Sequence, residues 1–206
     1  MIYLIGGAPR SGKTILSKRI AAQKNISWIS TDSIRAMVLA GTKKSLISKK
    51  FPYQKVSLEK NPAPELLRAE ITESKTLWPN VEALIKQFID CNEDYIVEGV
   101  HLMPRLVSKL KSTKYWKQIK IIYLVKDDLE KIQTGFALNT SAHDWLSGVV
   151  KDSDIAKRAA RMVQIKSRYI AREARKCRFK VIVTDDDFNL KIKAAVDEWN
   201  KASKAK

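Results

Sequence analysis

The feature that most constrains how this chain can fold is an eight-residue pattern near its N-terminus. The pattern G-x-x-x-x-G-K-[ST] is matched at every fixed position by the run Gly7, Ala8, Pro9, Arg10, Ser11, Gly12, Lys13 and Thr14. A β-prone apolar run at 2–5 precedes it and a helix-forming segment at 14–23 follows it, which is the strand, loop and helix context that a phosphate-binding loop needs. We therefore expect the chain to bind a nucleoside triphosphate.

The residue types of this Walker A pattern suit phosphate chemistry. Gly7 and Gly12 lack a Cβ, so the backbone can adopt positive φ angles and turn its N–H groups towards a phosphate. Lys13 is expected to reach the β- and γ-phosphates, and the Thr14 hydroxyl to bind the Mg²⁺ ion that bridges them. The alternative is a tight turn between a strand and a helix in which Lys13 is merely solvated.

Strand-like and helix-like segments alternate along the chain, a pattern typical of a parallel sheet with crossover helices. Strands are predicted at 2–5, 26–29, 94–98, 119–125 and 179–183, and helices at 13–23, 32–40, 65–91, 104–111, 127–138, 153–177 and 188–200. The prediction is a single α/β domain over 1–206, with a three-layer P-loop NTPase fold and a five-stranded parallel sheet. Lysines, serines and prolines at 41–64 predict a loop insertion after the second strand.

Composition limits the class of protein. The sequence has 206 residues, 45% of them hydrophobic, enough for one well-buried core. It has two cysteines without metal-type spacing and no apolar run near the roughly 20 residues of a membrane helix, so a cytoplasmic protein is expected. The net charge of +17 gathers at 41–60 and 151–180. Such a charge is compatible with nucleic acid, with phosphorylated small substrates, or with no functional meaning.

Polar residues that follow the predicted strands are candidates for the site, because ligands of open α/β sheets bind at the carboxyl ends of the strands. Asp32 follows the second strand and could accept the proton of an attacking hydroxyl, while Arg35 could hold an anionic group of the substrate. Glu98 ends the third strand, where an acid could act on Mg²⁺, and Gly99 and His101 follow as substrate contacts. The alternatives are a helix N-cap for Asp32, a lysine-paired carboxylate for Glu98 and a surface role for His101.

The helix at 153–177 carries an arginine stripe opposite its apolar face. Such a stripe is usually a solvated surface. The more specific hypothesis is that Arg158 and Arg161 stabilise the transferring phosphoryl group when a lid at about 139–158 closes and excludes water.

Three blocks of sequence together resemble 2-phosphoglycerate kinase and its relatives among the small P-loop kinases of the nucleoside-kinase-like group. They are the run 7–14, Ser-Thr-Asp-Ser-Ile-Arg at 30–35 and Val-Glu-Gly-Val-His-Leu-Met-Pro at 97–104. The resemblance implies a sheet of strand order 2-3-1-4-5, a lid, and transfer of the γ-phosphate of ATP, with Mg²⁺, to a hydroxyl of a small phosphorylated or anionic acceptor. It also implies that Asp32, Arg35, Glu98 and His101 face this acceptor. The segments 41–64 and 139–153 match no part of that family's pattern.

Two other functions remain open from the sequence. The Asp-x-x-Arg spacing of Asp32 and Arg35 also resembles polynucleotide 5′-hydroxyl kinases, which the basic charge favours, and zeta-toxin-type kinases of nucleotide sugars. The chain could instead be an ATP-dependent switch or binding module that docks a partner through its basic face. GTP is disfavoured, because the segment after the fourth strand, Val125 to Asp128, holds no Asn-Lys-x-Asp motif.

Overall fold

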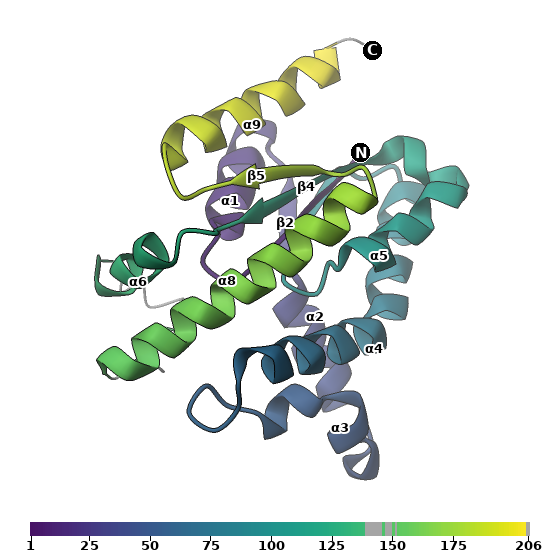
Figure 1. Cartoon of the computed structure of the whole chain (residues 1–206). Helices are drawn as coiled ribbons and strands as arrows, with labels where there is room; N and C mark the ends of the chain where they lie inside the picture. The colour runs from purple at the N-terminus through teal and green to yellow at the C-terminus, as the bar shows by residue number, and fades with distance from the viewer. Residues whose placement is uncertain (139–145, 147–149, 151, 205–206) are drawn as a thin grey trace.

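Five parallel strands form one sheet at the centre of this computed structural model, which describes residues 1–138, 146, 150 and 152–204 (Figure 1). The strands are β1 (Ile2–Gly7), β2 (Ser27–Ser30), β3 (Tyr95–Gly99), β4 (Ile119–Val125) and β5 (Lys180–Val183). They lie in the order β2-β3-β1-β4-β5, and every adjacent pair is parallel. The predicted parallel sheet and its strand order are confirmed.

Helices connect the strands of the described part of the chain. They are α1 (Lys13–Lys24), α2 (Thr31–Ala40), α3 (Lys44–Lys50), α4 (Ala63–Asp90), α5 (Pro104–Val107), α6 (Leu129–Leu138), α8 (Ser153–Lys176) and α9 (Phe188–Lys204), with 3-10 turns η1 (Pro52–Lys55), η2 (Ser108–Ser112) and η3 (Lys114–Gln118). Each predicted helix has a counterpart. The segment predicted as one helix at 104–111 is divided into α5 and η2.

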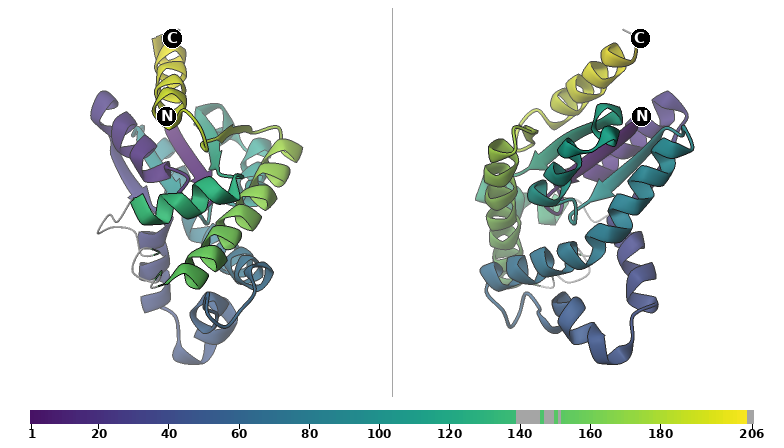
Figure 2. Two further views of the ribbon diagram at one scale, coloured as in Figure 1. Left: turned by 60° about the vertical axis from the view of Figure 1, so that its left-hand side comes forward. Right: turned by 90° about the vertical axis from the view of Figure 1, so that its right-hand side faces the viewer.

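Two hydrophobic clusters place helices on both faces of the sheet. Side chains of a strand alternate between its faces, so Tyr3 and Ile5 of β1 pack in one cluster while Ile2 and Leu4 pack in the other. The first cluster holds buried residues of α1 and α9, and the second holds those of α4, α5, α6 and α8. The three-layer arrangement is thus confirmed (Figure 2).

The segment 41–64, predicted as a loop, contains α3 and η1. The helix α3 buries none of its residues, so it shows no amphipathic period by which sequence analysis could find it. The ring of Phe51 in this segment is fully buried, and the Tyr53 N–H joins the segment to α4 by a 2.7 Å hydrogen bond to Oε1 of Glu73. Together with α2 and the first turns of α4 it extends from the sheet on the side away from α9 (Figure 2).

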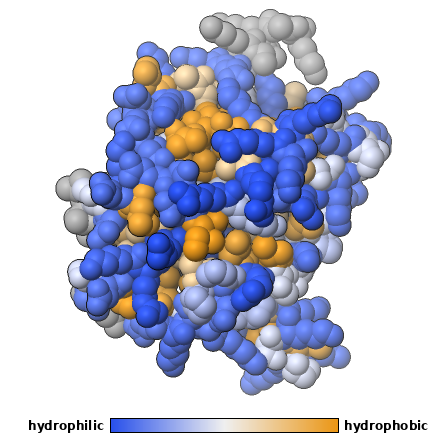
Figure 3. Space-filling model, in the orientation of Figure 1, coloured by the Kyte–Doolittle hydropathy of each residue, from blue (hydrophilic) through white to orange (hydrophobic). Residues whose placement is uncertain are grey.

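The arginine stripe of α8 has the solvated character expected of it. Arg158, Arg161, Arg168 and Arg172 are exposed, whereas Ala159 and Val163 of the same helix are fully buried. Hydrophilic side chains cover most of the face that carries α8, with apolar patches between them (Figure 3). Within the described residues, no helix combines the length and the apolar character that a bilayer span needs.

Candidate active site

The Walker A residues form the turn between β1 and α1. Gly7 has φ 147° and Gly12 has φ 95°. A Cβ would lie 2.0 Å from the carbonyl oxygen of Leu124 at Gly7, and 2.3 Å from the ring of Phe188 at Gly12, so both positions need glycine. No side chain caps the start of α1. The amides of its first turn are therefore left to a ligand, and an anion suits them because the helix N-terminus carries partial positive charge.

The other residues of the loop fix its shape. The Ser11 hydroxyl donates to the carbonyl oxygen of Ala8 at 2.8 Å, and Ala8 and Pro9 are buried. Arg10 has φ 58°, and its guanidinium points towards α6, where it donates to the carbonyl oxygen of Gly135 at 2.9 Å. The backbone of the loop, rather than these side chains, is thus the part available to phosphates.

Lys13 is buried at the start of α1, with 8% of its surface exposed. Its Nζ donates to the carbonyl oxygen of Ala8 at 2.7 Å. Burial lowers the pKa of Lys13, and the nearby carboxylates of Glu98 and Asp32 oppose that shift. The lysine is therefore a poorly hydrated cation, and a bound phosphate would stabilise its charged form.

Thr14 and Glu98 come together across the sheet edge. Glu98 is the second-last residue of β3 and is in register with Ile5 of β1 and Ser30 of β2. The Thr14 hydroxyl donates to Oε1 of Glu98 at 3.2 Å. Burial raises the pKa of Glu98, while the Lys13 ammonium and the Thr14 hydroxyl bond act in the opposite direction.

The oxygens of Thr14 and Glu98 are hard donors of the kind that Mg²⁺ takes. No group of three or more His, Cys, Asp or Glu side chains suited to a metal occurs in the described part of the chain. Mg²⁺ usually binds through one or two protein oxygens and completes its shell with phosphate and water.

Asp32 lies in the first turn of α2 but is not its N-cap. Ser30 is the cap, and its hydroxyl accepts from the Asp32 N–H at 3.1 Å. The Asp32 side chain is 62% exposed, and its Oδ1 lies 3.6 Å from Nδ1 of His101. The capping alternative is therefore wrong, and the carboxylate is free to meet a ligand.

His101 is buried below Asp32. Its Nδ1 lies 3.1 Å from the hydroxyl oxygen of Thr31. Burial lowers the pKa of His101, although the Asp32 carboxylate acts to raise it; the ring is therefore neutral at pH 7. The close packing also explains Gly99, where a Cβ would lie 1.8 Å from the Thr31 hydroxyl oxygen.

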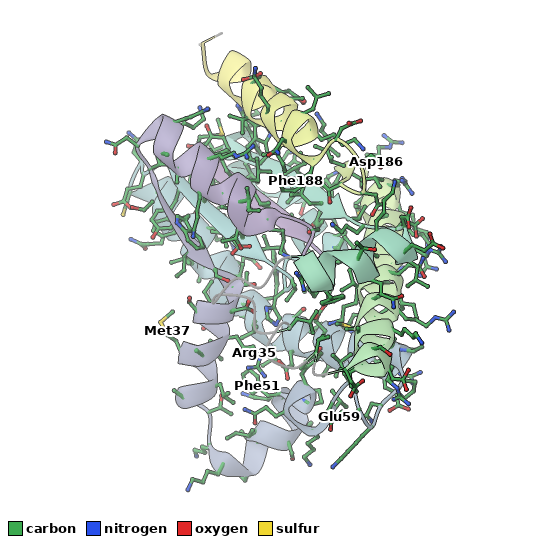
Figure 4. The ribbon with its side chains drawn as sticks, turned by 90° about the vertical axis from the view of Figure 1, so that its left-hand side faces the viewer. Arg35, Met37, Phe51, Glu59, Asp186 and Phe188 are labelled. Carbon is green, nitrogen blue, oxygen red and sulfur yellow. The ribbon has the colours of Figure 1, made fainter. Side chains whose placement is uncertain are left out.

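Arg35 is held by a glutamate that the sequence analysis did not identify. Its Nε donates to Oε2 of Glu73 at 2.6 Å and its Nη2 to Oε1 at 3.3 Å. The guanidinium also lies 5.6 Å from the centre of the Phe51 ring, between α2 and α8 (Figure 4). Arg35 is 24% exposed, so part of its surface is left for an acceptor.

A second buried ion pair adjoins this one and was also missed. Nζ of Lys166, on α8, lies 2.5 Å from Oε2 of Glu70, on α4, and donates to the Tyr53 hydroxyl at 3.3 Å. Burial acts to lower the pKa of Lys166, but Glu70 and Tyr53 outweigh it and raise that pKa overall. Oε1 of Glu70 is buried and has no hydrogen-bond partner in the described part of the chain. Their positions in the sequence could have identified these residues. Glu70 and Glu73 lie on the buried face of α4, and Lys166 lies on the buried face of α8.

Two residues after β5 complete the surroundings of the phosphate loop. The Thr184 hydroxyl donates to the carbonyl oxygen of Ser11 at 3.0 Å. The ring of Phe188, at the start of α9, lies against Gly12 (Figure 4). Neither residue belongs to a sequence motif. The order of the strands in the sheet is what brings both of them to the phosphate loop.

Arg158 contacts the insertion at 41–64. The Arg158 guanidinium donates to the carbonyl oxygens of Leu58 at 3.3 Å and Glu59 at 3.0 Å, and Figure 4 shows Glu59 beside the start of α8. Arg158 and Arg161 both line a cavity between this segment and α8. Most of the predicted lid at 139–158 lies outside the described residues, so the role of these arginines in phosphoryl transfer stays a prediction.

Comparison with known proteins establishes the fold. No protein-family model matches the sequence, and no curated protein sequence matches it. Shikimate kinase from Bacteroides thetaiotaomicron superposes with a TM-score of 0.56 at 13% identity, over 99% of this chain and 98% of that one. The chain has a P-loop kinase fold.

Two further solved structures resemble it more loosely. Dephospho-CoA kinase from Campylobacter jejuni has a TM-score of 0.48 at 18% identity, over 98% of both chains. Shikimate kinase from Aquifex aeolicus has a TM-score of 0.47 at 12% identity, also over 98% of both chains. The likeness to the Bacteroides thetaiotaomicron structure, at 13% identity, shows the fold alone, so the acceptor must be argued from the residues of this chain.

Proposed function

We propose that this protein is a magnesium-dependent kinase that transfers the γ-phosphate of ATP to a hydroxyl group of a small anionic metabolite. One observation carries the proposal. The phosphate loop with Lys13, the Thr14–Glu98 pair and the Asp32–His101 pair meet at the carboxyl ends of the adjacent strands β1, β3 and β2. A nucleotide phosphate, a metal and a hydroxyl group can be brought together there.

Each group has a separate task in this mechanism. The loop amides and Lys13 bind the β- and γ-phosphates and balance the charge that develops as the bridging P–O bond breaks. Thr14 and Glu98 would hold Mg²⁺, which neutralises phosphate charge when bound. Asp32 accepts the proton of the acceptor hydroxyl as its oxygen attacks the γ-phosphorus, so the products are ADP and a phosphate ester. Neutral His101 lies beside this carboxylate, with its Nδ1 3.6 Å from Oδ1 of Asp32.

The acceptor is proposed from the sequence resemblance, with 2-phosphoglycerate as the first compound to test. Arg35, one helical turn after Asp32, would bind the anionic group of the acceptor through the N–H groups that Glu73 does not occupy. The Glu73 carboxylate already neutralises the positive charge of the Arg35 guanidinium. The anionic group of the acceptor must therefore bind a guanidinium that is also bound to Glu73. We therefore expect modest affinity for the acceptor and strong dependence on its shape.

The test uses γ-labelled ATP with Mg²⁺ and a panel of acceptors. The panel holds 2-phosphoglycerate, other sugar and glycerate phosphates, nucleosides and a 5′-hydroxyl oligonucleotide. We expect label to move to one small anionic acceptor with the wild type, and Asp32→Asn to lower this transfer about 100-fold or more while ATP binding persists. Asp154→Asn, on the exposed first turn of α8, is the matched control. Label released only as inorganic phosphate, whatever the acceptor, would favour the switch, and label on the oligonucleotide would favour a polynucleotide kinase.

A further inference from the structure

A cavity of about 390 Å³ opens between α8 and the segment that leads into α4. Leu58, Leu66 and Ile165 form apolar parts of its wall, and Lys60, Arg158 and Arg161 contribute positive charge. Leu58 and Leu66 are almost completely buried, so the base of the cavity is well packed. Its volume is within the range of small-molecule sites.

The cavity is separate from the candidate active site. None of its lining residues belongs to the phosphate loop or to the Asp32–His101 and Thr14–Glu98 pairs. On α8, Lys166 points at Glu70. Arg161 precedes it by five residues, and at about 100° per residue its side chain leaves the helix roughly 140° away from that of Lys166. The cavity therefore adjoins the buried ion pair but includes neither Glu70 nor Lys166 in its lining.

The lining of the cavity carries positive charge. Among the described residues, no acidic side chain lines it. Within the described residues, neither the Lys60 ammonium nor the Arg161 guanidinium has a hydrogen-bond or ion-pair partner. The Arg158 guanidinium is fixed at the rim by the carbonyl oxygens of Leu58 and Glu59, which adds no negative charge. Three cations beside an apolar wall attract an anion and leave its hydrocarbon part a place to be buried.

We propose that this cavity is a second binding site, specific for an organic anion that joins a phosphate or carboxylate group to an apolar body. The anionic group accepts hydrogen bonds from Arg161 and Lys60, and the apolar body packs on Leu66 and Ile165. The site goes beyond the proposed kinase activity and does not depend on it. Its occupant would connect the insertion at 41–64 to α8.

Phenyl phosphate is a suitable probe, with inorganic phosphate and phenol as its two halves. Binding is measured by calorimetric titration of the wild type, Arg161→Gln, Lys157→Gln and Lys13→Ala. Arg161 is the preferred variant, since it is exposed and has no partner among the residues that the structure describes. Lys157 is exposed on the same helix and lines no part of the cavity, so it controls for lost charge. Lys13→Ala controls for binding at the phosphate loop.

We expect phenyl phosphate to bind more tightly than either half, and Arg161→Gln to weaken it about tenfold or more, as loss of a charge-assisted hydrogen bond would. Lys157→Gln and Lys13→Ala should leave this binding within about twofold of the wild type. Amide NMR shifts should concentrate at residues 58–66 and 158–165. Loss of binding in Lys13→Ala but not in Arg161→Gln would overturn the proposal and leave the nucleotide site intact. Equal affinity for inorganic phosphate and phenyl phosphate would also overturn it.

Discussion

The Nζ atom of Lys13 lies 2.7 Å from the carbonyl oxygen of Ala8, so the cation of the phosphate loop is hydrogen-bonded within its own loop. The bond stabilises a lysine whose burial disfavours its charge. The ammonium has two further N–H donors for an incoming phosphate oxygen. Because a charged oxygen is a stronger partner than a neutral one, such a bond favours nucleotide binding.

Replacement of Lys13 by alanine should therefore reduce phosphoryl transfer about 100-fold or more, the usual cost of losing one donor to the developing charge. Lys18→Ala is the matched control, because Lys18 is exposed on the same helix. The measurement is the steady-state rate with saturating acceptor, with circular dichroism to verify folding. Equal rates in Lys13→Ala and Lys18→Ala would remove Lys13 from the mechanism.

Glu98 gives a prediction about magnesium. Its pKa is raised by burial, and the gain of a metal charge would favour the ionised form that binds Mg²⁺. Glu98→Gln keeps the shape and the bond to Thr14 but loses the charge, so we expect the Mg²⁺ concentration for half-maximal activity to rise about tenfold. A titration of rate against Mg²⁺ measures this. The same half-maximal concentration in both proteins would place the metal elsewhere.

The fold and the phosphate loop could be predicted because their signals are local. The run from Gly7 to Thr14 matches a motif whose glycines are required by positive φ angles and close contacts. Most of the strands are short apolar runs, so their positions could be predicted from the sequence. Asp32 and Glu98 were predicted as site residues by the same logic, since Asp32 follows β2 and Glu98 is the second-last residue of β3.

The remaining parts of the site depend on contacts between distant segments. Glu70 and Lys166 are 96 residues apart in the chain, and charged residues on a helix are normally assigned to its solvated face. Phe188 meets Gly12 only because β5 and α9 return beside β4 and α1. No spacing rule in the sequence indicates either contact. The pairing of Arg35 with Glu73 across α2 and α4 was missed for the same reason.

The Lys166–Glu70 pair gives a prediction about stability. Lys166→Met leaves the Glu70 carboxylate buried without its counter-charge, which should cost about 3–5 kcal/mol of unfolding free energy. The double variant Lys166→Met with Glu70→Gln removes both charges, so it should recover a large part of that loss. Urea denaturation of the three proteins measures both effects. A double variant less stable than Lys166→Met would show that the pair itself, rather than the stranded charge, stabilises the fold.

His101 gives a prediction about pH. Burial holds its pKa below the ordinary value of 6.5, so the unfolded chain binds a proton at a higher pH than the folded one. As pH falls below about 6.5 the wild type should lose stability, with a slope of up to about 1.4 kcal/mol per pH unit from this group. His101→Gln cannot take up this proton and should flatten the profile in that range. Urea unfolding between about pH 7.5 and 5 measures the two slopes. Identical slopes would mean that His101 is protonated as readily in the folded protein as in the unfolded chain. The ring beside Asp32 would then not be kept neutral by burial.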